Sequence, residues 1–589
     1  MEAPPFIVQE DPVMAHYDFF LVSALEKVFP ACRPAGMGNG RCLSAWRGTR
    51  AAVQMAYYAD VKAPEMEVLP TFTVSVSGAP ALVCARTVEL VPSDYPSYAS
   101  AREDTDYLTH EPGLFPDLLK PLEGVKVTPI PGQYRSLWLS WEIPETAKPG
   151  DYEITIHICA DKIMPTPKGT ICRNPLAPEL RFALPFTLRV GRAALKQQEL
   201  IHTEWFHADC LASYYNVPIL GEEHWRIIDG FIASAASHGI NMLLTPVFTP
   251  PLDTQVGGER PTVQLVGVTL QEGKYAFDFT ALSRWVQICR KHGIRYLEIA
   301  HLFTQWGAKA TPKIEACVDG VTKRIFVWDV PAVSPGYRVF LQAFLPALRA
   351  HLNREGFEDR NVYFHISDEP GEKHLEDYRA AKRQVQDLLE GCPVIDALSS
   401  ITFYQKGLVT QPIPSNDHIQ AFFDAHVPEL WVYYCCGQSV DVPNRFFAMP
   451  SARNRIMGVL MYLYRIKGFL QWGFNFYYSQ HSLYPIDPYR VTHAGYAFPS
   501  GDAYLVYPGP GGAPLSSIRA EVQDDALLDL RALQMLEDLA GRSAVEELIH
   551  ETAGQKTITF ESYPRDAEFL LALREKVAAK IDHLLSENA

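Results

Sequence analysis

NVYFHISDEP, at residues 361–370, is the clearest indication of how this chain folds. Apolar side chains at alternate positions of 362–366 are typical of a buried strand. Asp368 and Glu369 follow at the carboxyl end of that strand, and Pro370 ends it. In barrels of parallel strands the reactive groups lie at this end. The stretch therefore predicts a barrel strand that carries a pair of functional carboxylates.

Similar runs recur after Arg192, and helical patterns separate most of them. Two of these helices end in His-Gly-Ile, at 238–240 and 292–294, where glycine is the usual left-handed end of a helix. Repeated β-then-α order implies parallel strands with crossovers, and eight such units predict a (β/α)8 barrel. The expected strands are LIHTEWFHAD (200–209), NMLLTPVF (241–248), RYLEIAHLF (295–303), VYFHISDEP (362–370), PVIDALS (393–399), HIQAFF (418–423), ELWVYYCC (429–436) and GFLQWGFN (468–475).

The first third of the chain has a different pattern, in which apolar and polar side chains alternate. This alternation, for example at 72–77 and 182–190, indicates strands with one buried face, as in a β-sandwich. Prolines and a glycine separate SLWLSWEI (136–143) from DYEITIHI (151–158). We expect these two runs to form an antiparallel pair joined by a turn.

The predicted fold class is therefore a multidomain β plus α/β protein. A β-sandwich in one or two parts occupies residues 1–195, and the TIM-like (β/α)8 barrel follows at 196–589. The last part, about 500–589, extends the barrel with AYLVYPG as a ninth candidate strand. Helices are expected there at about 515–540 and 563–587.

Composition excludes several classes of function. The net charge of −15 argues against binding to nucleic acid or to an anionic membrane. The longest apolar run, at 456–474, is interrupted by Arg465, Lys467 and Gln471, so we expect no span of a bilayer. The first residues have neither the basic nor the apolar region of a signal peptide, which predicts a cytoplasmic protein.

The 11 cysteines are odd in number and scattered, apart from the neighbours Cys435 and Cys436. No CxxC, HExxH or EF-hand pattern is present. The sequence predicts reduced thiols, no metal site and no cofactor.

Asp368 and Glu369 suit the cleavage of a glycosidic bond. This reaction needs an acid for the leaving oxygen and a second group that stabilises positive charge at the anomeric carbon. Neighbouring carboxylates oppose each other's ionisation, which keeps one proton available near neutral pH. The alternative is structural, because Asp-Glu-Pro also fits a solvated turn in which an acid caps the helix expected at 371–391.

Aromatic and polar side chains gather at the ends of other predicted strands. Aromatic rings stack on the apolar faces of sugars, and amides or imidazoles bind their hydroxyl groups. The candidates are Trp205, His207, His301, Trp306, Trp431, Tyr433, Trp472 and Asn475. Glu204, Asp209 and Glu298 also lie near strand ends and are alternative partners for Glu369.

An ordered set of motifs resembles glycoside hydrolase family 123, whose catalytic domain was long catalogued as a domain of unknown function. The resemblance covers roughly residues 196–530. Its motifs are ISDEP (366–370), ELWVYYCC (429–436), Asn444-Arg445-Phe446, GFLQWGFN (468–475), GDAYLVYPG (501–509) and SSIRAE (516–521).

The resemblance implies a retaining β-N-acetylgalactosaminidase that uses the acetamido group of its own substrate. It implies that Asp368 orients that group, whose oxygen attacks the anomeric carbon and forms an oxazolinium ion. Glu369 is then the general acid, and afterwards the base for water. Tyr433 is expected to donate a hydrogen bond to the acetamido oxygen, and Trp472 to lie under the sugar.

Two other functions stay open at this point. The chain could cleave a sugar without an acetamido group, with Glu369 as acid and Glu204 or Glu298 as a separate nucleophile. It could also be a barrel that binds glycans without cutting them. In each case the partner is a carbohydrate, and the long segments around 248–280 and 307–330 are candidate subsites for the rest of the glycan.

Overall fold

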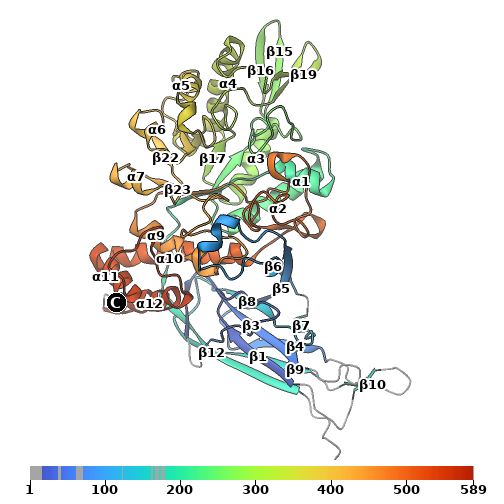
Figure 1. The fold of residues 1–589 in the computed structure, drawn as a ribbon, viewed down its shortest axis with the longest axis vertical. Coiled ribbons are helices and arrows are strands. Elements are labelled where there is room, and N and C mark those ends of the chain that lie inside the picture. Colours follow the sequence, from blue (N-terminus) through green and yellow to red (C-terminus); the bar gives the residue numbers. More distant parts are fainter. Residues whose placement is uncertain are drawn as a thin grey trace, which may run out of the picture.

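A computed structural model describes residues 16–37, 42–60, 70–122, 124–160, 163–165, 171–173 and 180–587. The molecule is elongated, with a strand-rich N-terminal part at one end and the parallel strands at the other (Figure 1). The C-terminal helices lie between these two parts (Figure 1). They are α10 (Ile518–Ala540), α11 (Arg542–Ala553) and α12 (Ala567–Glu587).

Two five-stranded sheets make up most of the N-terminal part. The first has the order β1 (His16–Val22), β3 (Arg50–Asp60), β8 (Arg135–Glu142), β5 (Val83–Ser93), β6 (Gly113–Pro121). The second has the order β2 (Cys42–Arg47), β12 (Leu180–Ala194), β9 (Gly150–Ala160), β4 (Phe72–Ser77), β7 (Lys126–Val127). A short hairpin, β10 (Ile163–Pro165) with β11 (Ile171–Arg173), and the 3-10 turn η1 (Ala99–Glu103) complete this part.

Both sheets contribute to one core. Met55 and Leu139 of the first sheet pack in the same buried cluster as Ile156 and Leu188 of the second, which is the arrangement of a sandwich. The expected pairing of SLWLSWEI with DYEITIHI was wrong. These runs are β8 and β9, which lie in different sheets, so the proline-rich link crosses from one sheet to the other. The boundary at residue 195 stays a prediction.

Six parallel strands form the sheet of the second part. In spatial order they are β20 (Val362–Phe364), β17 (Tyr296–Ile299), β14 (Met242–Thr245), β13 (Ile201–Glu204), β24 (Gly468–Gln471) and β23 (Trp431–Tyr433). Two further parallel strands, β21 (Ile395–Ala397) and β22 (Gln411–Ile413), form a separate ladder.

The prediction of a closed (β/α)8 barrel was wrong. The six-stranded sheet is a half-barrel, and only single bridges, Phe364 to Val394 and Ser415 to Tyr433, connect it to the two-stranded ladder. The strands on this side are three residues long, and each pairs along its length with one neighbour only, so the sheet is not continuous around the barrel.

One expected strand is a helix. HIQAFF contains the start of α7 (Gln420–Asp424), and the strand of this unit lies earlier, at β22. The link between HIQAFF and the next strand is too short for a helix. This agrees with HIQAFF itself being the helical part of the unit. AYLVYPG contributes only β25 (Tyr507–Pro508), which pairs with β26 (Pro514–Leu515).

Helices follow most of the parallel strands. They are α1 (Ala208–Tyr215), α2 (Glu222–Ser237), α3 (Thr280–Lys291), α4 (Pro335–Arg354), α5 (Leu375–Arg383), α6 (Thr402–Gln405), α8 (Ser451–Arg455) and α9 (Met457–Leu463). Short 3-10 turns are η2 (Asp359–Asn361), η3 (Glu372–His374), η4 (Gln480–Ser482) and η5 (Pro510–Gly512). Gly239 and Gly293 have φ of 71° and 78°, which confirms the left-handed helix ends.

Parts of the two segments considered as candidate subsites form a small sheet at the far end of the molecule (Figure 1). Its strands are β15 (Gly267–Gln271), β16 (Lys274–Asp278), β18 (Ile314–Val318) and β19 (Val321–Phe326). In the part of the chain that the structure describes, no helix combines the length and the apolar composition needed to cross a membrane.

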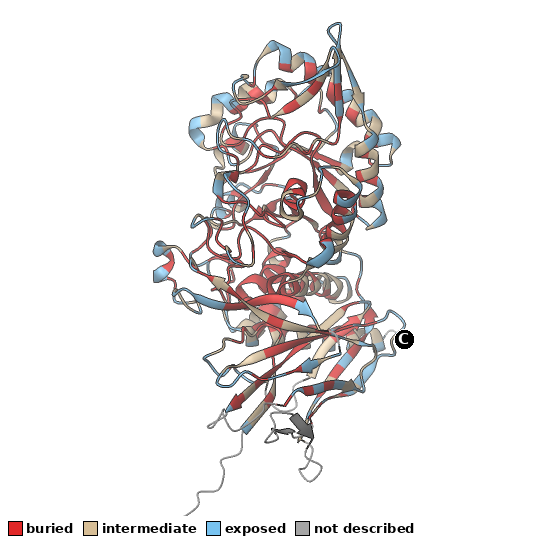
Figure 2. Cartoon of the chain, turned by 90° about the vertical axis from the view of Figure 1, so that its right-hand side faces the viewer, coloured by how far each residue is buried: buried red, intermediate tan, exposed pale blue. Residues whose placement is uncertain are grey.

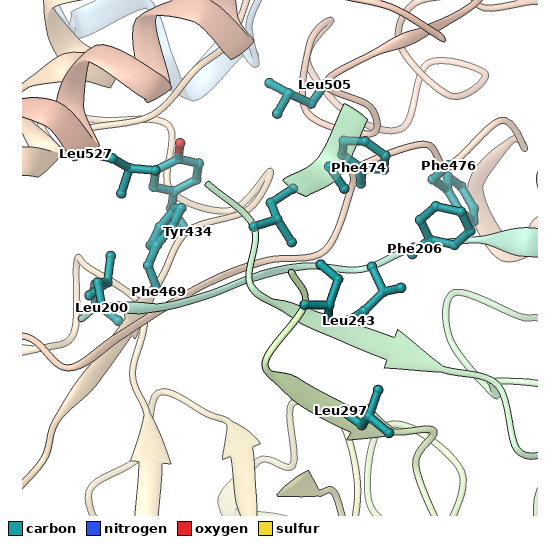
Figure 3. Close-up of a cluster of buried hydrophobic side chains, with 14 of the residues drawn as sticks. Leu200, Phe206, Leu243, Leu297, Tyr434, Phe469, Phe474, Phe476, Leu505 and Leu527 are labelled. Carbon is teal, nitrogen blue, oxygen red and sulfur yellow. The ribbon is translucent and has the colours of Figure 1, made fainter. Parts of the chain in front are cut away.

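Each parallel strand buries both faces, which concentrates buried residues at the centre of this part (Figure 2). Met242 and Leu244 of β14 face an inner cluster together with Tyr433, whereas Leu243 packs outward. The outward cluster joins Leu243 and other strand residues to Phe474 and to Leu527 of α10 (Figure 3). The helices thereby fix the strands whose carboxyl ends carry the site.

Candidate active site

A pocket of about 140 Å³ opens at the carboxyl ends of the parallel strands. Asp368 and Glu369 line it together with residues that follow five other strands. The lining residues are Trp205, Leu252, Asp253, Gln305, Trp306, Asp368, Glu369, Ala397, Tyr433, Cys435, Cys436, Leu470, Trp472, Gln480 and Phe498. Six of the ten side chains predicted from the sequence are among them.

Backbone conformation brings the two consecutive carboxyl groups into one pocket. A regular strand would point them to opposite faces, but β20 ends at Phe364, and Glu369 is left-handed, with φ of 42°. This conformation is costly for a residue with a side chain and persists only where neighbours enforce it.

Main-chain hydrogen bonds enforce the turn at both ends. The Trp306 N–H donates to the Asp368 carbonyl at 2.8 Å, and the Glu369 N–H donates to the Ala397 carbonyl at 3.1 Å. Neither acid caps the next helix, because η3 starts after Gly371 and α5 after His374, with no cap from Asp368 or Glu369. The structural alternative for Asp-Glu-Pro therefore has no support.

Both carboxyl groups favour the protonated form. Burial and the charge of Glu369 raise the pKa of Asp368 well above its usual range. Glu369 is exposed at the pocket, but the surrounding protein limits its hydration and raises its pKa, against a hydrogen bond from Tyr433. The pair therefore retains a proton at a pH where isolated carboxyl groups have lost theirs.

Aromatic side chains form the walls. The Tyr433 hydroxyl donates to Glu369 Oε1 at 2.8 Å. The indole of Trp472 donates to Asp502 Oδ2 at 2.9 Å, which fixes the plane of the ring. Burial raises the pKa of Asp502 to about 7. Trp205 is almost fully buried, and Trp306 is half-buried.

Four predicted residues do not line the pocket. Trp431 packs one layer below, with its ring 5.7 Å from that of Tyr363. His301 stacks on His365 at 4.1 Å, beneath the pocket. Asn475 exchanges two hydrogen bonds with the main chain of His207, and the His207 ring donates to the carbonyl of Trp472. His207 and Asn475 therefore support the Trp472 wall.

The alternative acids are also outside the pocket. Glu204 and Glu298 are fully buried. Arg445 binds Glu204 at 2.7 Å, and Trp205 and His365 bind Glu298 at 2.7 and 2.6 Å. Asp209 forms a bidentate pair with Arg260.

The prediction from sequence missed several lining residues, among them Asp253, Gln305, Gln480 and Phe498. Asp253 lies in the long segment after β14, and Gln305 precedes Trp306 in HLFTQWG. Burial raises the pKa of Asp253 to about 6. The sequence did contain a signal for Cys435 and Cys436, because they end the predicted strand ELWVYYCC; both line the pocket.

One group among the described residues has the spacing of metal ligands. Ligand atoms of His301, His365 and Asp396 lie within 4.8 Å of one another. However, each ring nitrogen of His365 already faces a carboxylate, Glu298 at 2.6 Å and Asp396 at 3.2 Å. This arrangement is a hydrogen-bonded chain rather than a set of free ligands.

Comparison with known proteins identifies the class and the family. The model of the glycoside hydrolase 123 catalytic domain matches residues 205–536, more than half of the chain. Parallel strands with a carboxylate pair at their carboxyl ends are compatible with this class, whose reaction uses two acids. The chain belongs to glycoside hydrolase family 123.

One solved structure has a similar fold. A family 123 glycoside hydrolase from Clostridium perfringens, described in terms of glycolipid glycan hydrolysis, has a TM-score of 0.68 at 15% identity, over 97% of this chain and 98% of that one. A putative β-galactosidase from Bacteroides fragilis reaches a TM-score of only 0.31 at 9% identity, over 87% and 60% of the two chains. Comparison with curated proteins finds no match.

Proposed function

We propose that the chain is a retaining exo-β-N-acetylgalactosaminidase that releases terminal β-linked N-acetylgalactosamine from glycans and glycoconjugates. Asp368, as a carboxylate, accepts a hydrogen bond from the N–H of the 2-acetamido group and orients it. The acetamido oxygen attacks the anomeric carbon while Glu369 protonates the leaving oxygen, and an oxazolinium ion forms. Glu369 then takes a proton from the water that reopens this ring.

The observation that carries this proposal is that Asp368 and Glu369 share one pocket in spite of being consecutive. One must be ionised and the other protonated for the reaction, and two carboxyl groups that share one pocket favour this state. Tyr433 lines the same pocket, and its hydroxyl, which bonds Glu369 in this structure, would donate to the acetamido oxygen of a bound substrate instead. Trp472 and Trp205 offer apolar surface to the sugar ring.

The size of the pocket favours a single terminal sugar. Its volume of about 140 Å³ is below the ~300–1,000 Å³ of sites that enclose drug-sized ligands. An enzyme that cuts within a glycan would need a longer groove at the same place.

A separate carboxylate nucleophile has less support. Glu204 and Glu298 are fully buried beneath the pocket. Asp253 does line it, but its Oδ2 is engaged by the N–H of His481 at 3.0 Å. A covalent sugar on Asp253 or Asp368 is therefore the outcome that would argue for this alternative.

A panel of nitrophenyl glycosides tests the proposal. Hydrolysis of N-acetyl-β-D-galactosaminide, with little release from plain β-galactoside, is expected. A thiazoline that mimics the cyclic intermediate should inhibit strongly, since ligands resembling the transition state bind tightly. Cleavage of plain galactosides, a trapped glycosyl-enzyme adduct, or binding without hydrolysis would each contradict the proposal.

A further inference from the structure

A chain of buried hydrogen bonds lies directly beneath the carboxylate pair. We call it the histidine cluster and define it as Glu298, His365, Tyr378 and Asp396. His365 Nε2 lies 2.6 Å from Glu298 Oε1, and its Nδ1 lies 3.2 Å from Asp396 Oδ1. The Tyr378 hydroxyl donates to Asp396 Oδ2. All four residues are fully buried, and none of them lines the pocket.

The partners of His365 determine its charge. An ionised carboxylate has no hydrogen to donate, so both ring nitrogens must carry one if both contacts are hydrogen bonds. Burial opposes this charge, but the hydrogen bonds to Asp396 and Glu298 outweigh it and raise the pKa of His365 to about 9. His301, stacked on His365, is neutral, because burial and the neighbouring charge lower its pKa well below the usual value.

The histidine cluster is connected through the backbone to the turn at residues 366–370, which carries Asp368 and Glu369. We call this segment the catalytic turn. Asp396 Oδ1 accepts hydrogen bonds from the N–H groups of Ile366 and Ser367 at 3.0 and 3.3 Å, immediately before Asp368. On the pocket side, the indole of Trp205 donates to Glu298 Oε1 at 2.7 Å. A change in the cluster therefore reaches both the turn and the pocket wall.

His365 is a positive charge three residues before Asp368 in the same segment. The charged groups with the largest effect on Asp368 are Glu369 from the same turn, Asp396 of β21, Asp253 after β14, and His365. The first three oppose ionisation of Asp368, and His365 favours it. No arginine or lysine pairs with Asp368 or Glu369 among the described residues.

We propose that His365 is a positioning residue that keeps Asp368 ionised during glycoside cleavage, with Glu298 and Asp396 holding its charge in place. This inference rests on the proposed function, in which Asp368 must be an anion opposite the developing oxazolinium ion. The charge of His365 would direct the proton of the pair to Glu369, where the leaving group needs it.

Another strand of the same sheet offers a matched control. His202 of β13 is as fully buried as His365 and bonds to Gln523 at 3.1 Å, with Glu204 at 3.6 Å. It has no contact with the catalytic turn. His202→Gln removes a buried imidazole of the same size without touching the pair.

The experiment compares His365→Gln with His202→Gln on nitrophenyl N-acetyl-β-D-galactosaminide across pH. His365→Gln should lower kcat by on the order of 10²–10³, as loss of a preorganised electrostatic group does, with a smaller change in KM. The acidic limb of its profile of kcat against pH should move to higher pH, because Asp368 then protonates more readily. His202→Gln should stay within about threefold of the wild type with an unmoved limb. An unmoved limb in folded His365→Gln would overturn the inference.

Failure of the two proposals is distinguishable. If the wild type does not hydrolyse N-acetylated glycosides, the proposed function is wrong. If it does, but His365→Gln keeps its kcat and pH profile, only the inference about His365 is wrong.

A second variant and a measurement on the wild type cover the case in which His365→Gln does not fold. Glu298→Gln keeps a side chain that can bond Thr203, and we expect about a tenfold lower kcat. In wild-type protein labelled with ¹⁵N-histidine, one imidazole should keep two slowly exchanging ring protons up to pH 8, and Glu298→Gln should shift its signal. Absence of such an imidazole would also overturn the inference.

Discussion

Two groups of carboxyl side chains in this molecule differ in what neutralises their charge. Where the helices α8 and α10 meet the sandwich and each other, buried carboxylates pair with arginines. We call this region the seam and define it by the pairs Arg519–Asp117, Arg86–Glu521, Arg50–Glu521, Arg453–Asp104 and Arg455–Asp529. At the pocket, Asp253, Asp368 and Glu369 have no arginine or lysine partner among the described residues.

The pKa values follow this difference. Burial alone would raise the pKa of Glu521, but Arg86 and Arg50 hold it far below its usual value. Burial raises the pKa of Asp368, and no arginine opposes it. An arginine keeps its charge at any pH a protein meets, so Arg86 and Arg50 hold Glu521 in the ionised form near neutral pH. The seam therefore serves stability, while the pocket keeps carboxyl groups that can exchange protons.

The largest effect is expected from breaking a seam pair. Arg519 binds both oxygens of Asp117 at 2.9 Å, and both side chains are almost fully buried. Arg519→Met leaves the Asp117 charge unpaired, which should lower the free energy of unfolding by about 3–5 kcal/mol. Urea unfolding measures this. Adding Asp117→Asn should restore much of the loss, and a loss below about 1 kcal/mol would contradict the assignment of the seam.

Removal of a carboxyl group from the pocket should lower activity but not stability, the reverse of what is expected at the seam. Asp368→Asn should lower kcat on every N-acetyl substrate by on the order of 10²–10³. It should leave the free energy of unfolding equal or higher, because it removes a half-buried carboxyl group whose pKa the surroundings raise. Glu369→Gln should harm substrates with poor leaving groups most, since good ones need little protonation. Steady-state kinetics with two leaving groups, beside urea unfolding, tests both. Loss of stability in Asp368→Asn would remove the contrast with the seam.

The pH dependence of stability should also distinguish pocket carboxyl groups from seam carboxylates, and Asp253 is the test case. Its pKa is raised to about 6 in the folded protein, against ~3.9 for an unperturbed Asp. The folded state therefore binds more protons than the unfolded state between these values, and stability falls as pH rises from about 4 to 6. Asp253→Asn should raise the free energy of unfolding by about 1–2 kcal/mol at pH 7.5 and leave it unchanged at pH 4. Asp529→Asn, which breaks an arginine pair, should lower it at pH 7.5.

Strand periodicity predicted the elements that carry the site, but it did not predict whether their sheet closes into a barrel. The run at 361–370 placed Asp368 and Glu369 at the end of a parallel strand, and β20 with its neighbours has this arrangement. Periodicity does not distinguish a short apolar helix from a strand, so HIQAFF was assigned to the wrong class. Three-residue strands such as β21 leave too few hydrogen bonds for a sequence pattern to predict whether a sheet closes.

The site residues that the sequence missed depend on tertiary structure. Asp253 and Gln480 come from loops with no periodic pattern, and the contact between Asp253 and the turn at His481 exists only in the folded chain. His301 and His207 were expected in the pocket because they follow strands, yet both lie one layer beneath it. A strand end predicts proximity to a site, whereas the direction of the side chain depends on the turn that follows.

The smallest effect is expected from Tyr433→Phe, which changes the ionisation equilibrium of Glu369 without removing a charge. Its hydroxyl donates to Glu369 Oε1 at 2.8 Å and stabilises the ionised carboxylate, which lowers the pKa that burial raises. Tyr433→Phe removes this donor, so Glu369 should hold its proton to higher pH. The basic limb of kcat against pH should move up by less than about one unit, equivalent to less than about 1.4 kcal/mol. The limb position is the measurement, because kcat itself also falls if Tyr433 binds the acetamido oxygen.

Tyr434→Phe is the matched control, since that hydroxyl points to Asn454 on the other side of the strand and the limb should not move. A shift to lower pH in Tyr433→Phe would mean that Tyr433 favours the protonated form of Glu369, and would place the proton of the pair differently.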